Sequence, residues 1–150
     1  MTNTYVSLRY HIVFSTKERF HWITQDIEER VWAYIGGIAK DNGLHPIQIG
    51  GVDDHLHCLI GAPPTIAPAK MAQLLKGGSS RWIGTTFPNM RGFAWQDGYG
   101  AFTVSASKVS QLIEYIRNQR KHHQSMSFRE EYLLMLQRHG ISYDERYLWG

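Results

Sequence analysis

The sequence predicts an α+β fold in which an antiparallel sheet carries two helices on one face and further helices follow at the C-terminus. Apolar side chains recur at strand-like spacing in some segments and at helical spacing in others, and glycine, proline and asparagine separate these segments. A length of 150 residues suits one domain. Hydrophobic residues make up 43% of the chain and charged residues 19%, which excludes a mainly disordered protein. We therefore expect a single domain over residues 1–150.

The first half of the chain is typical of a strand, a helix and two more strands. Thr24 is a candidate N-cap, and the apolar residues after it recur at helical spacing until Asn42 and Gly43 end the helix. A turn at residues 51–54 separates the next two segments, which favour strands. The predicted elements are a strand at 5–14, a helix between 24 and 42, and strands at 44–50 and 55–61.

The second half predicts one more helix and strand, and then additional helices. Pro68 can open the helix, whose apolar stripe passes Gly77 and Gly78, where the missing side chains allow close packing. A strand at 101–105, helices at 107–123 and 128–138, and an aromatic tail at 143–149 follow. The order β-α-β-β-α-β is that of the ferredoxin-like split βαβ unit, with the C-terminal helices added to it.

Charge and cysteine content exclude several classes of protein. The net charge of +3 and the pI near 9.1 permit nucleic-acid binding without diagnosing it. No apolar run approaches the roughly 18 residues of a membrane span, and no signal pattern opens the chain. The single cysteine, Cys58, excludes an internal disulfide and a cysteine-built zinc site. These features lead us to expect a cytoplasmic protein.

His55 and His57 are separated by one residue on a predicted strand. Their imidazoles therefore point to the same face of the sheet, opposite to Leu56, Cys58 and Ile60. If the two helices cover the apolar face, the imidazoles project from a helix-free face that a substrate can reach. Two neutral imidazoles in this arrangement can share one divalent ion. The pair alone is also compatible with histidines that bond only to water or neighbours, and two ligands leave a metal site incomplete.

Tyr115 and Gln119 lie one turn apart on the predicted helix 107–123 and share a polar face of it. The Gln119 amide oxygen can supply a third metal ligand. A tyrosine hydroxyl is a usable nucleophile when a metal polarises the phosphate it attacks. The alternatives are an amphipathic tyrosine at a helix–sheet boundary and a solvated glutamine. The end of this helix is cationic, which suits DNA phosphates as well as the helix dipole, through Arg117, Arg120, Lys121 and His122.

The combination of these motifs resembles the single-tyrosine HUH transposases of the small insertion-sequence (IS200-like) family. The resemblance rests on Asp53-Asp54-His55-Leu56-His57 and on Tyr115-Ile116-Arg117-Asn118-Gln119. It extends to residues 10–14, 95–102 and 143–148, and so covers nearly the whole chain.

The resemblance implies a ferredoxin-like homodimer that acts on single-stranded DNA with hairpins and holds Mg²⁺ or Mn²⁺. His55 and His57 match the HUH pair, Gln119 the third metal ligand and Tyr115 the nucleophile. It implies cleavage and rejoining of DNA through a 5′-phosphotyrosine intermediate, with active sites that two subunits can share. Lys76 and Arg81 on the second helix are additional candidates for contact with DNA phosphates.

Three other functions stay open. A domesticated, repeat-associated tyrosine transposase has the same motifs. A replication initiator or relaxase uses the same HUH chemistry, usually in a larger protein. A non-catalytic ferredoxin-like nucleic-acid-binding module requires neither the histidine pair nor Tyr115 and Gln119.

Overall fold

The computed structural model describes residues 3–149, and the outermost residues of the expected domain, Met1, Thr2 and Gly150, lie outside that range. Its core is a four-stranded sheet in the spatial order β2-β3-β1-β4, in which all neighbouring strands are antiparallel. The strands are β1 (Leu8–Ser15), β2 (His45–Val52), β3 (His55–Ala62) and β4 (Gly100–Thr103). This order and the two intervening helices confirm the predicted ferredoxin-like α+β fold.

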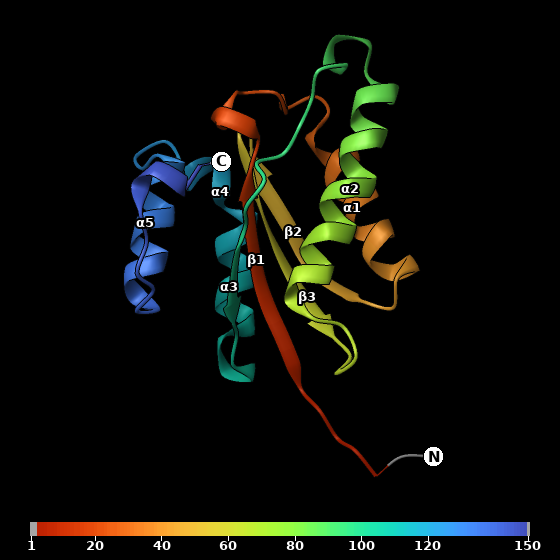
Figure 1. The fold of residues 1–150 in the computed structure, drawn as a ribbon, viewed down its shortest axis with the longest axis vertical. Coiled ribbons are helices and arrows are strands. Elements are labelled where there is room, and N and C mark those ends of the chain that lie inside the picture. The colour runs from red at the N-terminus through yellow and green to blue at the C-terminus, as the bar shows by residue number, and fades with distance from the viewer. Residues whose placement is uncertain (1–2, 150) are drawn as a thin grey trace.

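Helices α1 (Glu28–Asp41) and α2 (Pro68–Thr86) cover one face of the sheet, as the apolar pattern predicts (Figure 1). The side chains beneath them alternate along the strands and form one apolar core, which includes Ile12, Phe14, Leu56, Cys58 and Ile60. The two helices approach closely at Gly78, which has no side chain. A Cβ added at Gly78 would lie only 3.0 Å from the Ile38 side chain. The close packing expected at the paired glycines is therefore found at Gly78.

The opposite face of the sheet is covered by the C-terminal helices α3 (Val109–Arg117), α4 (Gln119–His122) and α5 (Phe128–Arg138) (Figure 1). A second apolar cluster holds α5 against the sheet and contains Val13, Phe102, Phe128, Tyr132 and Leu136. A capping box between Ser127 and Glu130 begins α5. The expectation of a helix-free face is therefore wrong, because this face is also partly apolar and must be shielded from water.

The aromatic tail packs against α5 within the same chain. Trp149 lies with its ring centroid 5.9 Å from that of Phe128 and 5.7 Å from that of Tyr132. The Arg19 guanidinium lies 4.2 Å from the Trp149 ring. The tail therefore helps to hold α5 on the sheet.

Several predicted boundaries shift for local physical reasons. β1 begins at Leu8 rather than at residue 5, because its pairing with β3 ends at Leu8 and Ala62. Thr24 does not cap α1, since its hydroxyl bonds to the Asp26 carboxylate and a turn delays the helix to Glu28. Single 3₁₀ turns lie at Lys17–Arg19, Pro88–Met90, Ala106–Lys108 and Glu145–Tyr147.

The predicted helix 107–123 is interrupted at Asn118, whose φ of −96° and ψ of 20° leave the helical region. Asn118 still donates its backbone N–H to the Glu114 carbonyl, but these backbone angles end α3, and α4 begins at the next residue. Asparagine favours such terminal conformations over helix interiors. Just before the break, Ile116 lies against Gly50 of β2, where a Cβ would be 2.9 Å from the Ile116 carbonyl oxygen. The break turns Gln119 into the protein.

Candidate active site

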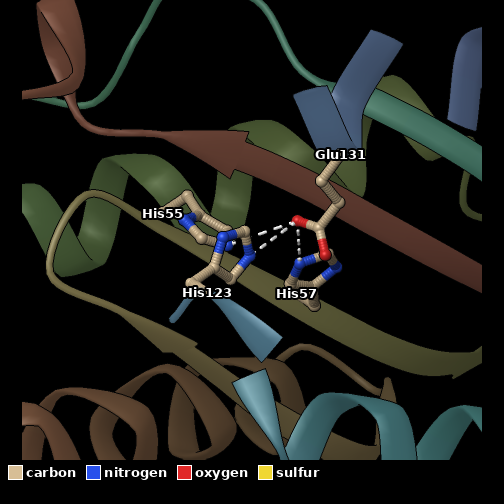
Figure 2. Close-up of side chains that lie close together, drawn as sticks. All are labelled: His55, His57, His123 and Glu131. Atoms are coloured by element: carbon tan, nitrogen blue, oxygen red, sulfur yellow. Dashed lines mark hydrogen bonds and ion pairs between the residues drawn. The ribbon is translucent and has the colours of Figure 1, made fainter. Parts of the chain in front are cut away.

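Strand β3 places the His55 and His57 side chains side by side on the face covered by α3, α4 and α5. Both imidazoles are fully buried, with an exposed fraction of 0%. His123, which follows α4, and Glu131 of α5 reach the same point from the covering helices (Figure 2). The histidine pair is therefore enclosed by other polar side chains of the same chain.

Each of the three histidines is oriented by a partner at its outer ring nitrogen. His55 Nδ1 lies 2.7 Å from Asp54 Oδ1, and His123 Nδ1 lies 2.5 Å from the Met126 carbonyl oxygen. Because a carboxylate and a carbonyl only accept hydrogen bonds, both Nδ1 atoms donate. Their Nε2 atoms are therefore available to face the centre of the site, the arrangement that orients imidazoles for metal binding.

The outer partner of His57 is another histidine. His57 Nδ1 lies 2.7 Å from Nε2 of the buried His11 of β1, and the two rings are stacked. Burial lowers the pKa of both His11 and His57, so both imidazoles are neutral near pH 7. When His57 donates Nδ1–H to His11, its Nε2 lone pair points into the site.

Lone-pair donor atoms converge at the centre of this site. The three Nε2 atoms of His55, His57 and His123 lie 3.4, 3.0 and 3.2 Å from Glu131 Oε1, and the four ligand atoms all lie within 4.8 Å of one another (Figure 2). Gln119 Oε1 lies 2.9 Å from His55 Nε2 and 3.0 Å from His123 Nε2. Facing lone pairs repel one another, so the set requires a positive species between its members. This donor chemistry fits a divalent metal ion.

A proton is the other positive species that the site can hold. Burial acts to lower the pKa of His55, but its hydrogen bonds to Asp54 and Glu131 outweigh burial and raise that pKa to about 9. Burial acts to raise the pKa of Asp54, which is nevertheless lowered by the same bond to His55. A divalent ion bound by the His55 Nε2 atom would take the place of the second proton on His55.

Glu131 connects this cluster to Tyr115. Its Oε2 accepts a hydrogen bond from the Tyr115 hydroxyl and another, of 3.1 Å, from the Gln119 side-chain amide. His122 Nε2 lies 3.3 Å from the same oxygen. Burial would raise the pKa of Glu131, but the neighbouring histidines, His57 foremost, hold it well below its usual range. A single buried carboxylate therefore contacts both the metal-capable cluster and the predicted nucleophile.

Tyr115 is half-buried and protonated in this arrangement. Burial and the negative charge of Glu131 raise the pKa of Tyr115 well above its usual value. The hydroxyl is therefore held as a hydrogen-bond donor rather than as a phenolate.

The cationic residues predicted to contact DNA occupy different surroundings. Arg120 is engaged by two carboxylates, with its Nη2 atom 2.6 Å from Glu28 Oε2 and 3.1 Å from Asp53 Oδ1. Arg117 pairs with Glu114 of its own helix. Of the other four candidates, only His122 forms an ion pair with a carboxylate among residues 3–149, and its partner is Glu131.

Two of these four lie beside Tyr115 and two lie on α2. Lys121 and His122 line a surface hollow together with Tyr115. Lys76 donates hydrogen bonds of 2.8 and 3.0 Å to the carbonyls of Asp97 and Gly98, so it ties the loop after α2 to that helix. Arg81 is exposed on α2 and lines a different hollow.

Sequence reasoning did not identify His123 or Glu131 as site residues. Glu131 occupies a position of the buried stripe of α5, with Phe128, Tyr132 and Leu136, where an apolar side chain is the ordinary choice. A carboxylate in an apolar stripe is a signal that could have found it. His123 follows Gln119 by four residues, which is a weaker signal in a segment already rich in polar side chains.

Comparisons with known proteins agree on one family. The chain matches the family described as "Transposase IS200 like" over residues 4–119. It is 29% identical over 117 residues to the ISDra2 transposase TnpA of Deinococcus radiodurans, covering 75% of this chain and 84% of that protein. It is 25% identical over 125 residues to the transposase for insertion sequence element IS200 of Salmonella typhimurium, covering 79% of this chain and 81% of that protein.

Solved structures agree with the sequence comparison. A crystal structure from Deinococcus radiodurans R1 assigned as a transposase superposes with a TM-score of 0.67 and 28% identity, covering 79% of this chain and 95% of that one. A REP-associated tyrosine transposase bound to a REP hairpin superposes with a TM-score of 0.57 and 12% identity, covering 82% and 73% of the two chains. The second likeness concerns the fold. None of the helices within residues 3–149 has the length and hydropathy needed to cross a membrane.

Proposed function

Because the chain belongs to the IS200-like transposase family, we propose that it cleaves and rejoins single-stranded DNA at the hairpin-bearing ends of a mobile element. The observation that carries this proposal is the contact of one buried carboxylate, Glu131, with both the Tyr115 hydroxyl and the imidazole cluster. A nucleophile and a metal-capable cluster in direct contact support phosphoryl transfer to protein.

In the proposed site, His55 and His57 hold Mg²⁺ or Mn²⁺ together with Gln119, and His123 and Glu131 complete the set of donors within reach. Imidazole nitrogens favour Mn²⁺ over Mg²⁺ in this set, since Mg²⁺ prefers oxygen ligands. When bound, the ion acts as a Lewis acid that polarises the scissile phosphate.

The outer contacts to Asp54, His11 and Met126 keep the imidazole rings of His55, His57 and His123 oriented.

Tyr115 acts as the nucleophile. Its hydroxyl oxygen forms a bond to phosphorus, the bond from phosphorus to the 3′ oxygen breaks, and the tyrosine proton is finally carried by the released 3′-hydroxyl. The product is a 5′-phosphotyrosine, and attack by a different 3′-hydroxyl reverses the step and joins two strands. Glu131 holds the hydroxyl in place before the substrate enters.

We further propose that the protein works in the cytoplasm, next to the nucleoid, as a homodimer formed by single-domain subunits of residues 1–150. In the described chain, α3 packs on its own sheet, chiefly against β2, so Tyr115 reaches the histidines of the same subunit. Among the proposed phosphate contacts, Lys121 and His122 line a hollow with Tyr115, and Arg120 lines another with Asp54 and His123. Arg117 ends α3, while Lys76 and Arg81 lie on α2, on the other side of the sheet.

The test of this function is a covalent adduct. Wild-type protein mixed with labelled hairpin single-stranded DNA and Mn²⁺ should give a denaturation-resistant protein–DNA species whose peptide map places the DNA on Tyr115. Tyr115→Phe removes only the hydroxyl and should give no adduct, whereas Tyr147→Phe, at an exposed tail residue, should behave as wild type. An adduct on another residue would contradict the assignment, and binding without any adduct would favour the non-catalytic module.

A thermal-shift measurement tests the metal separately from activity. At roughly 100 times the Kd, Mn²⁺ should stabilise the wild-type protein by about 2.7 kcal/mol relative to protein in EDTA. His57→Ala should lose this gain, while His45→Ala, at an exposed position on β2, should retain it. An equal shift in the His57→Ala variant would place the metal elsewhere.

A further inference from the structure

A cavity of about 610 Å³ opens beside the candidate active site, between α3 and α5 at the end of β4. Its walls include Lys108, Gln111 and Tyr115 on one side and Arg138 and His139 on the other. We call this cavity the α3–α5 groove. Tyr115 forms part of its wall, so any molecule in the groove lies next to the predicted nucleophile.

The charge of the α3–α5 groove suits an anionic chain. Lys108 and Arg138 are exposed, and neither forms an ion pair with a carboxylate among residues 3–149. No aspartate or glutamate lines the groove. Two unneutralised cations on facing walls attract phosphates.

The floor of the α3–α5 groove is aromatic. Phe102 and His139 lie with their ring centroids 4.5 Å apart and tilted by 32°, and His11 lies 6.1 Å from Phe102. His11 also bonds to His57, so the floor is continuous with the histidine cluster. Flat rings beside unpaired cations are the combination on which proteins stack the bases and bind the phosphates of single strands.

A second hollow, of about 510 Å³, lies on the other side of Tyr115. Glu114, Asn118, Lys121 and His122 line it, and Gln111 and Tyr115 line both this hollow and the α3–α5 groove. The Glu114 carboxylate is paired with Arg117. A strand that occupies both places therefore passes its backbone across Tyr115.

We propose that the α3–α5 groove holds the single-stranded DNA segment on one side of the scissile phosphate, with Lys108 and Arg138 binding its phosphates. The exposed His139 ring, which lies against the buried Phe102 ring, stacks a base. The second hollow receives the segment on the other side. This proposal rests on the proposed function and adds the path of the substrate strand and two phosphate-binding residues, Lys108 and Arg138, to it.

Binding of a fluorescein-labelled oligothymidylate of about 20 nucleotides tests the groove by anisotropy, without cleavage. Lys108→Ala and Arg138→Ala should each weaken binding by about threefold to tenfold and lower the slope of log K against log salt by about 0.7. Lys70→Ala and Arg91→Ala remove the same charges from α2 and the turn after it, and should leave binding unchanged. Equal effects in the two pairs of variants would overturn the proposal.

Photocrosslinking locates the strand directly. The Tyr115→Phe variant, which keeps its substrate intact, is irradiated with hairpin single-stranded DNA that carries 5-iodouracil next to the scissile phosphate. Crosslinked peptides should contain Met135 or His139, which both line the groove and are accessible there. Crosslinks confined to α1 or α2 would overturn the proposal.

The two experiments separate this proposal from the function on which it rests. If wild-type protein forms the Tyr115 adduct but the groove variants bind as the α2 controls do, the strand takes another path and the transposase function stands. If wild-type protein forms no adduct, the proposed function fails whatever the crosslinks show.

Discussion

Leu56 and His57 are neighbours on β3 and both are fully buried, yet they lie on opposite faces of the sheet. Leu56 belongs to the continuous apolar core under α1 and α2. His57 lies under α5, where a small apolar cluster surrounds a polar one built around Glu131. The first face derives its stability from apolar burial, which requires only shape and volume. The second face requires each buried polar atom to meet a specific partner.

Burial therefore has two purposes in this protein. On the α1–α2 face it stabilises the fold, and on the α3–α5 face it orients the imidazoles, the amide and the carboxylate to which we assign the proposed chemistry. Substitutions on the first face should therefore lower stability with the chemistry retained. Substitutions on the second should remove the chemistry from a protein that still folds.

The largest expected effect is on catalysis. His57→Ala should lower cleavage of hairpin single-stranded DNA by about 10³-fold or more, because the metal loses one of its ligands. Circular dichroism should show native secondary structure, since α1, α2 and their core are untouched. If the His57→Ala variant cleaves within tenfold of the wild-type rate, the buried polar side chains of the α3–α5 face are not required for cleavage.

Leu56→Ala, one residue earlier, should lower the stability of the fold and leave the cleavage rate nearly unchanged, the reverse of what we expect for His57→Ala. The deletion leaves a cavity in the dry core and should lower the free energy of unfolding by about 3 kcal/mol, measured by urea denaturation. Folded protein at low temperature should retain its cleavage rate within about threefold, because Leu56 contacts no site residue on the other face. A stable variant with a severe loss of cleavage would show that the faces are coupled.

Gly50→Val should affect both properties moderately. A Cβ at Gly50 would lie 2.9 Å from the Ile116 carbonyl oxygen, so α3 must move away from its own sheet. We expect a loss of about 1–3 kcal/mol in the free energy of unfolding, and a fall in cleavage because Tyr115 and Gln119 are carried with the helix.

Gly37→Ala is the matched control for this helix displacement. A Cβ at Gly37 meets nothing within 4 Å, and alanine suits a helix better, so stability should rise by about 0.5–1 kcal/mol with cleavage unchanged. Full cleavage by Gly50→Val would contradict the inference that this contact positions Tyr115.

The smallest expected effect concerns Tyr132, in the apolar part of the α3–α5 face. Burial raises the pKa of Tyr132 to about 12 from its usual value near 10. An acid with a raised folded-state pKa contributes its full stability below pH 10 and loses it as the pH rises to 12, because the unfolded chain ionises first. Tyr132→Phe cannot ionise, so the stability of wild type relative to this variant should fall by about 2 kcal/mol between pH 10 and pH 12. Parallel pH curves would mean that the hydroxyl is not buried.

Local patterns in the sequence predicted much of this molecule. The order of strands and helices, the alternation that separates His55 and His57 from Leu56 and Cys58, and the helix that carries Tyr115 each depend on residues only a few positions apart. Backbone geometry converts such short spacings into faces, so the fold class and the placement of the histidine pair on one face follow from sequence alone.

How α5 covers the sheet face that carries His55 and His57 depends on tertiary packing. Glu131 is 74 residues from His57 in sequence, and its contact with that ring depends on how α5 packs on the sheet. The place of Gln119 in the site likewise depends on how α3 packs on β2, where Ile116 lies against Gly50 of a distant strand. Long-range packing of this kind leaves no periodic trace in the sequence, because each partner is chosen by its position in space rather than by its distance along the chain. The sheet, the histidine pair and the tyrosine thus follow from local sequence patterns, whereas the carboxylate that contacts both the imidazoles and the tyrosine depends on the packing of α5.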